Sequence, residues 1–226
     1  MATAFDIDVG VSGTVTGLHY RATPSRREPT TVVLAHGAGG PQLSPFMTTF
    51  SSALSARGID VVTFNFVYME KGRRAPDPKA RLENCYRAAI DATRRVVPSA
   101  RARIIIGGKS MGGRIASQVV AEDASDLGVS GLVFLGYPLH PPGRLEKRRD
   151  AHLVDVGAPM LFVQGSRDTF GTETELRPVV EACQRAELHI VDGGDHSLKV
   201  RGKDAPSVDE VYASVQDAIV NWIDAL

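Results

Sequence analysis

Short apolar segments alternate with longer amphipathic ones along most of the chain. The short segments are rich in β-branched residues, and several are apolar at consecutive positions rather than at alternate ones. This pattern is typical of strands that are covered on both faces in a parallel sheet. Six such strands are predicted: Thr31–Ala35, Asp60–Phe66, Arg103–Ile106, Gly131–Leu135, Met160–Val163 and Leu188–Val191.

The intervening segments carry helix signals. Ser44 followed by Pro45 fits the N-cap and first turn of a helix, and Gly58 stands where a C-terminal cap belongs. Another helix is predicted from Met111 to about Ala121. Apolar residues at a period of about 3.6 predict two more: Leu82 to Val97, ending at Pro98, and Val208 to Trp222, beginning at a Ser207–Glu210 capping box.

Strands that alternate with helices predict an α/β fold of three layers, with a mostly parallel central sheet and helices on both faces. A chain of 226 residues can bury roughly 70 to 75% of its unfolded surface around one core, so residues 1–226 are expected to form a single domain. The pattern is less regular within residues 1–29, where peripheral strands are expected, with Thr14–Tyr20 as the candidate. Ligands of such folds bind at the carboxyl ends of the strands.

The motif with the clearest chemistry follows the third predicted strand and precedes a predicted helix. Gly108, Ser110 and Gly112 satisfy G-x-S-x-G, in which a strand turns sharply into a helix and holds the serine in a strained conformation. Larger side chains at the two flanking positions would collide with the turn. A phosphate-binding loop would need glycine at position 103, which is Arg103. The motif therefore predicts a nucleophilic serine, the alternative being a glycine-rich turn with an incidental serine.

A second glycine-rich loop, residues 36–40, follows the first predicted strand. Glycines let backbone N–H groups turn toward a developing negative charge. We expect the amide of Ala38 to be one such donor and the amide of Met111 to be its partner. A dinucleotide-binding fingerprint would need glycine at position 42, which is Gln42, and a plain tight turn is the remaining alternative. His36 is expected to be structural.

Two further strand ends carry groups that would complete a nucleophilic site. Asp168 follows the fifth predicted strand, where a carboxylate can fix the tautomer of an imidazole, although aspartate is also common in turns. His196 lies in a glycine-bounded loop after the last strand, and histidine can exchange a proton with serine at neutral pH. His189 lies within a predicted strand and is expected to be packed there.

The order Ser110, Asp168, His196 is that of α/β-hydrolases, which the chain resembles from about Thr30 to its C-terminal helix. The segments LAHGAGG, GGKSMGGR and GYPLHPPG resemble a dienelactone-hydrolase-related branch that includes testis-expressed protein 30 and bacterial relatives. The resemblance implies Ser110 as nucleophile, Asp168 as acid, His196 as base, and no cofactor. Dienelactone hydrolases proper have cysteine as the nucleophile, so their substrate is not carried over.

These residues predict a serine hydrolase that cleaves a small ester, thioester or related acyl bond. The rival hypothesis is a non-catalytic interaction module on the same scaffold. The segment 136–159 is too short for a helical lid domain, which favours small soluble acyl substrates. Candidates for lining the substrate pocket are Gly39, Lys109, Tyr137 and Leu139.

Basic residues gather in two segments, and they either attract an anionic substrate or form solvated surface. The first segment follows a strand end and the second lies within 136–159. Their members are Lys71, Arg73, Arg74, Lys79 and Arg81, and then Arg144, Lys147, Arg148 and Arg149.

Composition excludes several other classes. The 26 basic residues equal the 26 acidic ones, so a nucleic-acid partner is not expected. Cys85 and Cys183 match no metal-ligand spacing and are too few for a disulfide framework, so no metal is expected. Without a signal peptide or an apolar run of about 20 residues, the sequence predicts a cytoplasmic protein that does not bind membranes. It does not set the oligomeric state.

Overall fold

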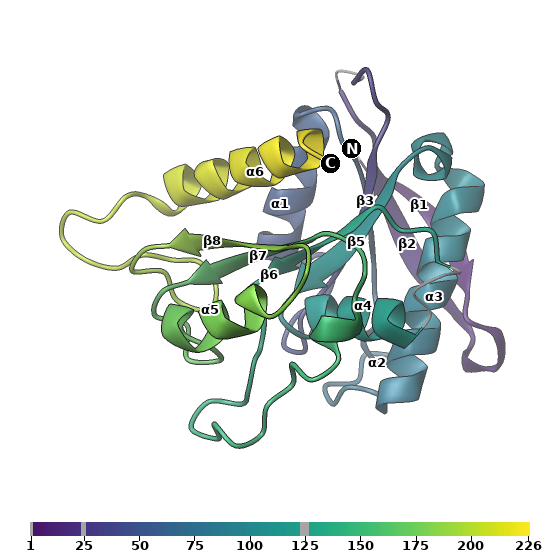
Figure 1. The fold of residues 1–226 in the computed structure, drawn as a ribbon. Coiled ribbons are helices and arrows are strands. Elements are labelled where there is room, and N and C mark those ends of the chain that lie inside the picture. Colours follow the sequence, from purple (N-terminus) through teal and green to yellow (C-terminus); the bar gives the residue numbers. More distant parts are fainter. Residues whose placement is uncertain (1, 24–25, 123–126) are drawn as a thin grey trace.

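The computed structural model describes residues 2–23, 26–122 and 127–226. Their strands are β1 (Thr3–Asp8), β2 (Thr14–Tyr20), β3 (Thr31–Ala35), β4 (Asp60–Phe64), β5 (Ile104–Lys109), β6 (Gly131–Leu135), β7 (Met160–Gly165) and β8 (Ala186–Val191). All of them join one sheet in the order β1-β2-β4-β3-β5-β6-β7-β8 (Figure 1). The strands from β3 to β8 run parallel, and the β1–β2 hairpin extends the sheet antiparallel to β4.

Helices cover both faces of this sheet, as the alternating sequence pattern predicts. They are α1 (Pro45–Ala56), α2 (Val67–Glu70), α3 (Lys79–Val96), α4 (Met111–Glu122), α5 (Glu173–Glu181) and α6 (Val208–Asp224). Successive residues of a strand point to opposite faces. Val32 and Leu34 of β3 pack in the core beneath α1 and α6, whereas Val33 and Ala35 pack in the core beneath α3, α4 and α5 (Figure 1).

The predicted elements are confirmed, with differences at their ends. The strands Thr14–Tyr20, Thr31–Ala35 and Gly131–Leu135 have the predicted bounds. The helix signals also hold: α1 has Ser44 as its N-cap, and α6 begins with the predicted capping box. The α/β fold of three layers is therefore the observed architecture.

Two strand ends differ from the prediction because of their neighbours. β4 ends at Phe64 instead of Phe66, because its pairing with Ala35 of β3 and with Gly17 of β2 stops at that residue. β5 continues beyond Ile106 to Lys109 because its two glycines stay paired with both β3 and β6. This continuation carries the glycine motif to the carboxyl edge of the sheet.

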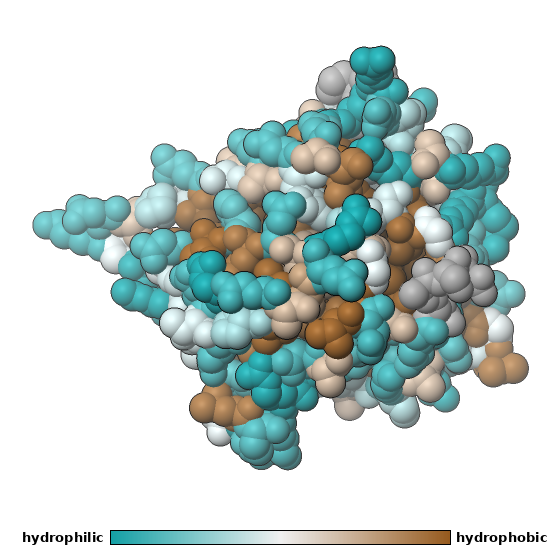
Figure 2. Space-filling model, in the orientation of Figure 1, coloured by the Kyte–Doolittle hydropathy of each residue, from teal (hydrophilic) through white to brown (hydrophobic). Residues whose placement is uncertain are grey.

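No helical lid interrupts the described fold between β6 and β7. The segment 136–159 contains only a short 3₁₀ turn at Leu153–Asp155. It hangs below the sheet in Figure 1, and the lower projection of the molecule in Figure 2 is mostly hydrophilic. Among the helices of the described residues, none is both long enough and apolar enough to cross a membrane.

Candidate active site

Ser110 occupies the sharp turn between β5 and α4. Its φ of 50° lies in the left-handed region, which is strained for a residue with a side chain. The flanking glycines make the turn sterically feasible. A Cβ atom on Gly108 would lie 2.2 Å from the carbonyl oxygen of Ala35, and one on Gly112 would lie 2.3 Å from the same atom. The turn therefore packs directly on the end of β3 and leaves Ser110 at the edge of the sheet.

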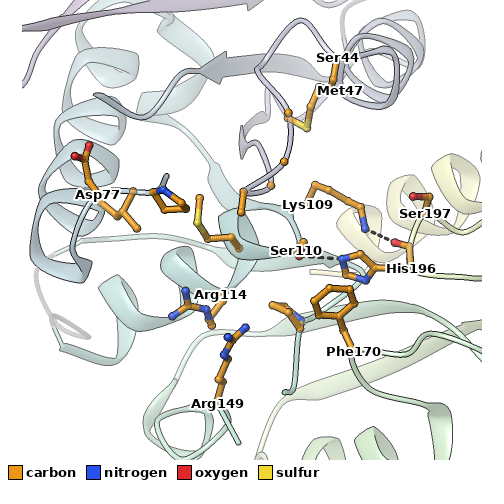
Figure 3. A pocket seen from close by; sticks show the side chains of 18 of the residues that line it. Ser44, Met47, Asp77, Lys109, Ser110, Arg114, Arg149, Phe170, His196 and Ser197 are labelled. Atoms are coloured by element: carbon orange, nitrogen blue, oxygen red, sulfur yellow. Dashed lines mark hydrogen bonds between the residues drawn. The ribbon is translucent and has the colours of Figure 1, made fainter. Parts of the chain in front are cut away.

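A chain of hydrogen bonds joins the three predicted residues. The Oγ atom of Ser110 lies 2.9 Å from Nε2 of His196 (Figure 3). Nδ1 of the same ring lies 2.7 Å from Oδ2 of Asp168. Asp168 is fully buried, and a carboxylate only accepts hydrogen bonds, so Nδ1 carries a proton and donates it to Asp168. In the neutral ring Nε2 is then free to accept the hydroxyl proton of Ser110.

Asp168 is held in place by two partners besides His196. The side-chain amide of Gln164 donates to Oδ2 at 2.9 Å, and the N–H of Phe170 donates to Oδ1 at 2.8 Å. Gln164 is itself fixed, because its carbonyl oxygen accepts from the N–H of Tyr137 at 2.7 Å. The carboxylate therefore has one orientation, which directs Oδ2 toward the imidazole.

The loop that carries His196 is anchored from three sides. Asp195 accepts hydrogen bonds from N–H groups later in the loop, and the hydroxyl of Tyr212 on α6 donates to the carbonyl of Ser197 at 3.0 Å. Nζ of Lys109 donates to the carbonyl of His196. The ring of Phe170 stacks on the imidazole with 4.2 Å between centroids. Burial lowers the pKa of Lys109 to about 8, so this cation loses charge in mildly alkaline solution.

His36 organises the glycine-rich loop after β3 and does not reach Ser110 in the described contacts. Its Nδ1 donates to the carbonyl of Gly37 at 2.7 Å, and its Nε2 accepts from the N–H of Phe66 at 3.1 Å. The loop is also held at Ala38, whose carbonyl accepts from the hydroxyl of Tyr68 at 3.2 Å. The structural role that the sequence indicates for His36 therefore agrees with its contacts.

The buried imidazole of His36 makes folding stability dependent on pH. Burial lowers its pKa from 6.5 to about 4 in the folded protein. In the unfolded chain this imidazole therefore becomes protonated below pH 6.5, whereas in the folded chain it stays neutral down to about pH 4. The contribution of the neutral imidazole to the unfolding free energy is complete above pH 6.5. It is lost as the pH falls toward 4, which lowers the unfolding free energy by on the order of 3 kcal/mol.

We therefore expect the unfolding free energy of His36→Gln to depend less steeply on pH than that of the wild type. Urea denaturation between pH 7 and pH 4 measures both slopes. The variant is expected to be less stable at pH 7 and to approach the wild type as the solution becomes acidic. Parallel pH profiles for the two proteins would show that His36 is not buried as a neutral ring.

A cavity of about 660 Å³ opens beside Ser110 and His196. Gly39 and Lys109 line it, as the sequence predicts, together with Ala38 and Met111. Met111 is the first residue of α4, and the N–H groups of a first helical turn have no partner inside the helix. The loop after β3 and the first turn of α4 thus bring the residues Ala38 and Met111 to the wall of the cavity, and the donor roles of their amides stay a prediction.

Tyr137 and Leu139 do not line this cavity, which corrects the sequence prediction. Tyr137 is 1% exposed and Leu139 is fully buried, and both belong to the core beneath α3, α4 and α5. The backbone turns sharply after β6, since the N–H of Leu139 donates to the carbonyl of Tyr137 at 3.1 Å. Pro138, between them, is the one of the three that faces the cavity.

Sequence reasoning missed several residues that line the cavity or support it. Phe170 and Arg114 line the cavity, and Gln164 lies behind it. Arg114 follows Ser110 by four residues on a predicted helix, so its place beside the serine could have been inferred. The positions of Phe170 and Gln164 depend on how the turn after β7 folds, and no periodic signal marks them.

The two basic segments differ in how their charges are used. In the first, Arg73 and Arg81 both pair with Asp77, at 2.8 and 3.2 Å, and Lys79 pairs with Glu122 at 2.7 Å. In the second, Arg144 and Lys147 are exposed to solvent, and Arg148 pairs with Asp150. Arg149 alone of that segment lines the cavity. Most of the predicted basic surface is therefore solvated or neutralised.

Known structures share this architecture at low sequence identity. A lidless α/β serine hydrolase from Xanthomonas campestris is 20% identical, with a TM-score of 0.73 over 98% of this chain and 94% of its own. Dienelactone hydrolase from Anabaena variabilis is 18% identical, with a TM-score of 0.75 over 100% and 97%. An α/β serine hydrolase homologue from Coxiella burnetii is 18% identical, with a TM-score of 0.74 over 97% and 96%.

The comparisons support the resemblance to the dienelactone-hydrolase-related branch, whereas the narrower resemblance to testis-expressed protein 30 stays a prediction. The family described as an alpha/beta hydrolase domain matches residues 28–224, which include the whole parallel part of the sheet and every residue of the candidate site. The chain therefore belongs to the α/β-hydrolase family.

Proposed function

We propose that the protein is a serine hydrolase, of carboxylesterase type, that cleaves a small ester, thioester or related acyl bond. The observation that carries the proposal is the hydrogen-bonded chain from Ser110 through His196 to the buried Asp168. The strained backbone of Ser110 supports it further, since strain of this kind persists where the surrounding structure holds a reactive group in position.

In the first step Oγ of Ser110 attacks the carbonyl carbon of the substrate. Nε2 of His196 takes the hydroxyl proton, and the resulting imidazolium is stabilised by Asp168 through Nδ1–H. The carbonyl oxygen becomes negatively charged in the tetrahedral intermediate. We assign the amides of Ala38 and Met111 as the donors of hydrogen bonds to this oxygen, and one such donor contributes about 3 to 4 kcal/mol.

In the second step the intermediate collapses and the bond to the leaving group breaks. The proton held on Nε2 of His196 passes to the leaving group, which departs as an alcohol or thiol. The acyl group stays on Oγ of Ser110 as an ester. A water molecule then gives a proton to His196 and attacks this ester, which releases the carboxylic acid and restores the serine. Every step uses only groups of this chain, the substrate and water.

The size and openness of the site favour a small substrate. The segment between β6 and β7 supplies no helical cover, and the cavity of about 660 Å³ is within the range of sites for small molecules. A series of 4-nitrophenyl esters of increasing acyl length would locate the preference. We expect short acyl chains to give the highest kcat/KM.

Covalent labelling by a fluorophosphonate tests the proposed function. The reagent is expected to modify Ser110 in the folded protein and to leave Ser110→Ala unlabelled, because a serine activated by histidine is far more nucleophilic than an ordinary one. Ser117→Ala is a matched control, since Ser117 is a buried serine on α4 that donates to the carbonyl of Arg114. An unlabelled wild-type protein would favour the non-catalytic interaction module.

A further inference from the structure

Two arginine side chains face the cavity beside Ser110 from different elements. Arg114 lies one helical turn after the serine, and its backbone N–H donates to the backbone carbonyl of Ser110 at 3.1 Å. Arg149 comes from the loop between β6 and β7. Both line the cavity, and Figure 3 shows the two guanidinium groups close to one another on one side of Ser110. Lys109 lies on the other side, next to His196 (Figure 3).

The hydrogen-bonding capacity of these two groups is largely unused within the described residues. Arg114 donates through Nη1 to the side chain of Gln118 at 3.2 Å, but its buried Nε has no partner. The main chain of Arg149 is fixed, because its N–H donates to Leu139 at 2.9 Å and its carbonyl accepts from the hydroxyl of Tyr137 at 2.8 Å. Its guanidinium makes no hydrogen bond or ion pair in the part of the chain that the structure describes.

The nearby acidic groups are already engaged with other cations. Arg148 pairs with Asp150, the carboxylate next to Arg149 in the sequence. Glu83 acts on Arg114 electrostatically, but it pairs with Lys79 at 3.2 Å. Asp77 lines the same cavity, but Arg73 and Arg81 both pair with its Oδ1 atom. In Figure 3 its carboxylate points away from Arg114 and Arg149.

The two guanidinium groups consequently face each other as like charges. Burial, and then the charge of Arg149, lower the pKa of Arg114 from its usual value. A guanidinium nevertheless stays protonated at neutral pH, so the repulsion is present under working conditions. A single anion placed between the groups would remove the repulsion and would supply acceptors for the unused N–H groups.

We propose that Arg114 and Arg149 form a carboxylate-binding subsite, and that the substrate is an ester whose acyl or alcohol part carries a carboxylate remote from the scissile bond. A carboxylate suits the site because two oxygens in a plane match the fork of N–H donors on a guanidinium. The proposal rests on the proposed hydrolase function, since it names the class of substrate that Ser110 would attack.

Two matched pairs of esters test this subsite. Mono-4-nitrophenyl adipate ends its acyl chain in a carboxylate, and its methyl ester ends the same chain in an uncharged group. The second pair, 4-acetoxybenzoate and methyl 4-acetoxybenzoate, differs in the same way on the leaving group. We expect the wild type to prefer the anionic member of at least one pair by on the order of 10-fold in kcat/KM, as a charge-assisted hydrogen bond would give.

The preference should depend on the two arginines and not on general surface charge. The ratio of kcat/KM within the pair is expected to fall toward one in Arg149→Gln and in Arg114→Gln. Arg144→Gln is the matched control, because it removes the same charge from an exposed arginine of the same segment that does not line the cavity, and it should keep the ratio. No preference in either pair, or a preference that survives both arginine substitutions, would overturn the proposal.

Failure of the subsite can be distinguished from failure of the hydrolase proposal. If no ester is cleaved and the fluorophosphonate does not label Ser110, the hydrolase proposal fails. Calorimetric titration of adipate into Ser110→Ala then tests the subsite alone. Binding that disappears in Ser110→Ala with Arg149→Gln supports the subsite, and the absence of binding to Ser110→Ala overturns it.

Discussion

Replacing Ser110 with alanine is expected to lower kcat for a 4-nitrophenyl ester by on the order of 10⁶-fold. The reason is that Ser110 Oγ and His196 Nε2, 2.9 Å apart, act as one unit, so the loss of the nucleophile leaves nothing for the base to activate. Steady-state kinetics on the purified variant measures the effect. The fold should be unchanged, because alanine has the Cβ that the turn already accommodates.

Non-additivity provides the control for this prediction. His196→Ala should cost about as much as Ser110→Ala, and the double variant should be little worse than either one, since both changes disable the same step. Two losses that multiply in the double variant would mean that the serine and the histidine act independently. A variant Ser110→Ala with full activity would place the nucleophile elsewhere.

The second large effect is expected at the buried carboxylate. Asp168→Asn should lower kcat by about 10⁴-fold, because an amide N–H can donate a hydrogen bond to Nδ1 of His196 and so favour the tautomer whose Nε2 carries the proton and cannot take the proton of Ser110. Gln164 and the N–H of Phe170 both donate to Asp168, so the new amide group also loses part of its anchoring. The measurement is kcat for an activated ester across neutral pH.

Asp217→Asn is the matched control for this substitution. Asp217 is 63% exposed and pairs with Arg57 on the molecular surface, so the same chemical change there should leave kcat unaltered. Equal activity of Asp168→Asn and the wild type would contradict the role assigned to Asp168. A variant that lost its fold would be recognised by its circular dichroism spectrum.

The fold followed from the sequence where local signals and the final environment agree. β3 is apolar at consecutive positions because helices cover both of its faces, so its run predicted a buried parallel strand with the correct ends. The helix α5 was missed although Thr172 and Glu175 form a capping box, because the helix is short and its apolar face has few residues. β8 starts at Ala186, two residues before the prediction, since an edge strand retains polar, half-exposed positions.

The site could be predicted to the extent that each group is tied to a strand end. Ser110 and His196 follow strands whose carboxyl ends meet at one edge of the sheet, and glycines mark both turns. Tyr137 was misplaced because the direction of a side chain after a strand depends on the path of the loop. Arg149 was seen only as one member of a basic segment, because nothing in its neighbours distinguishes a side chain facing the cavity from one facing solvent.

The acyl-enzyme on Ser110 is the central claim of the account, and trapping it tests that claim most directly. The protein is mixed with excess 4-nitrophenyl butyrate, quenched in acid within the first turnover and digested for mass spectrometry. We predict a burst of 4-nitrophenol close to the enzyme concentration and one butyryl group on the peptide 110–114, absent in Ser110→Ala. Turnover without an adduct at Ser110, or an adduct on another residue, would contradict the account.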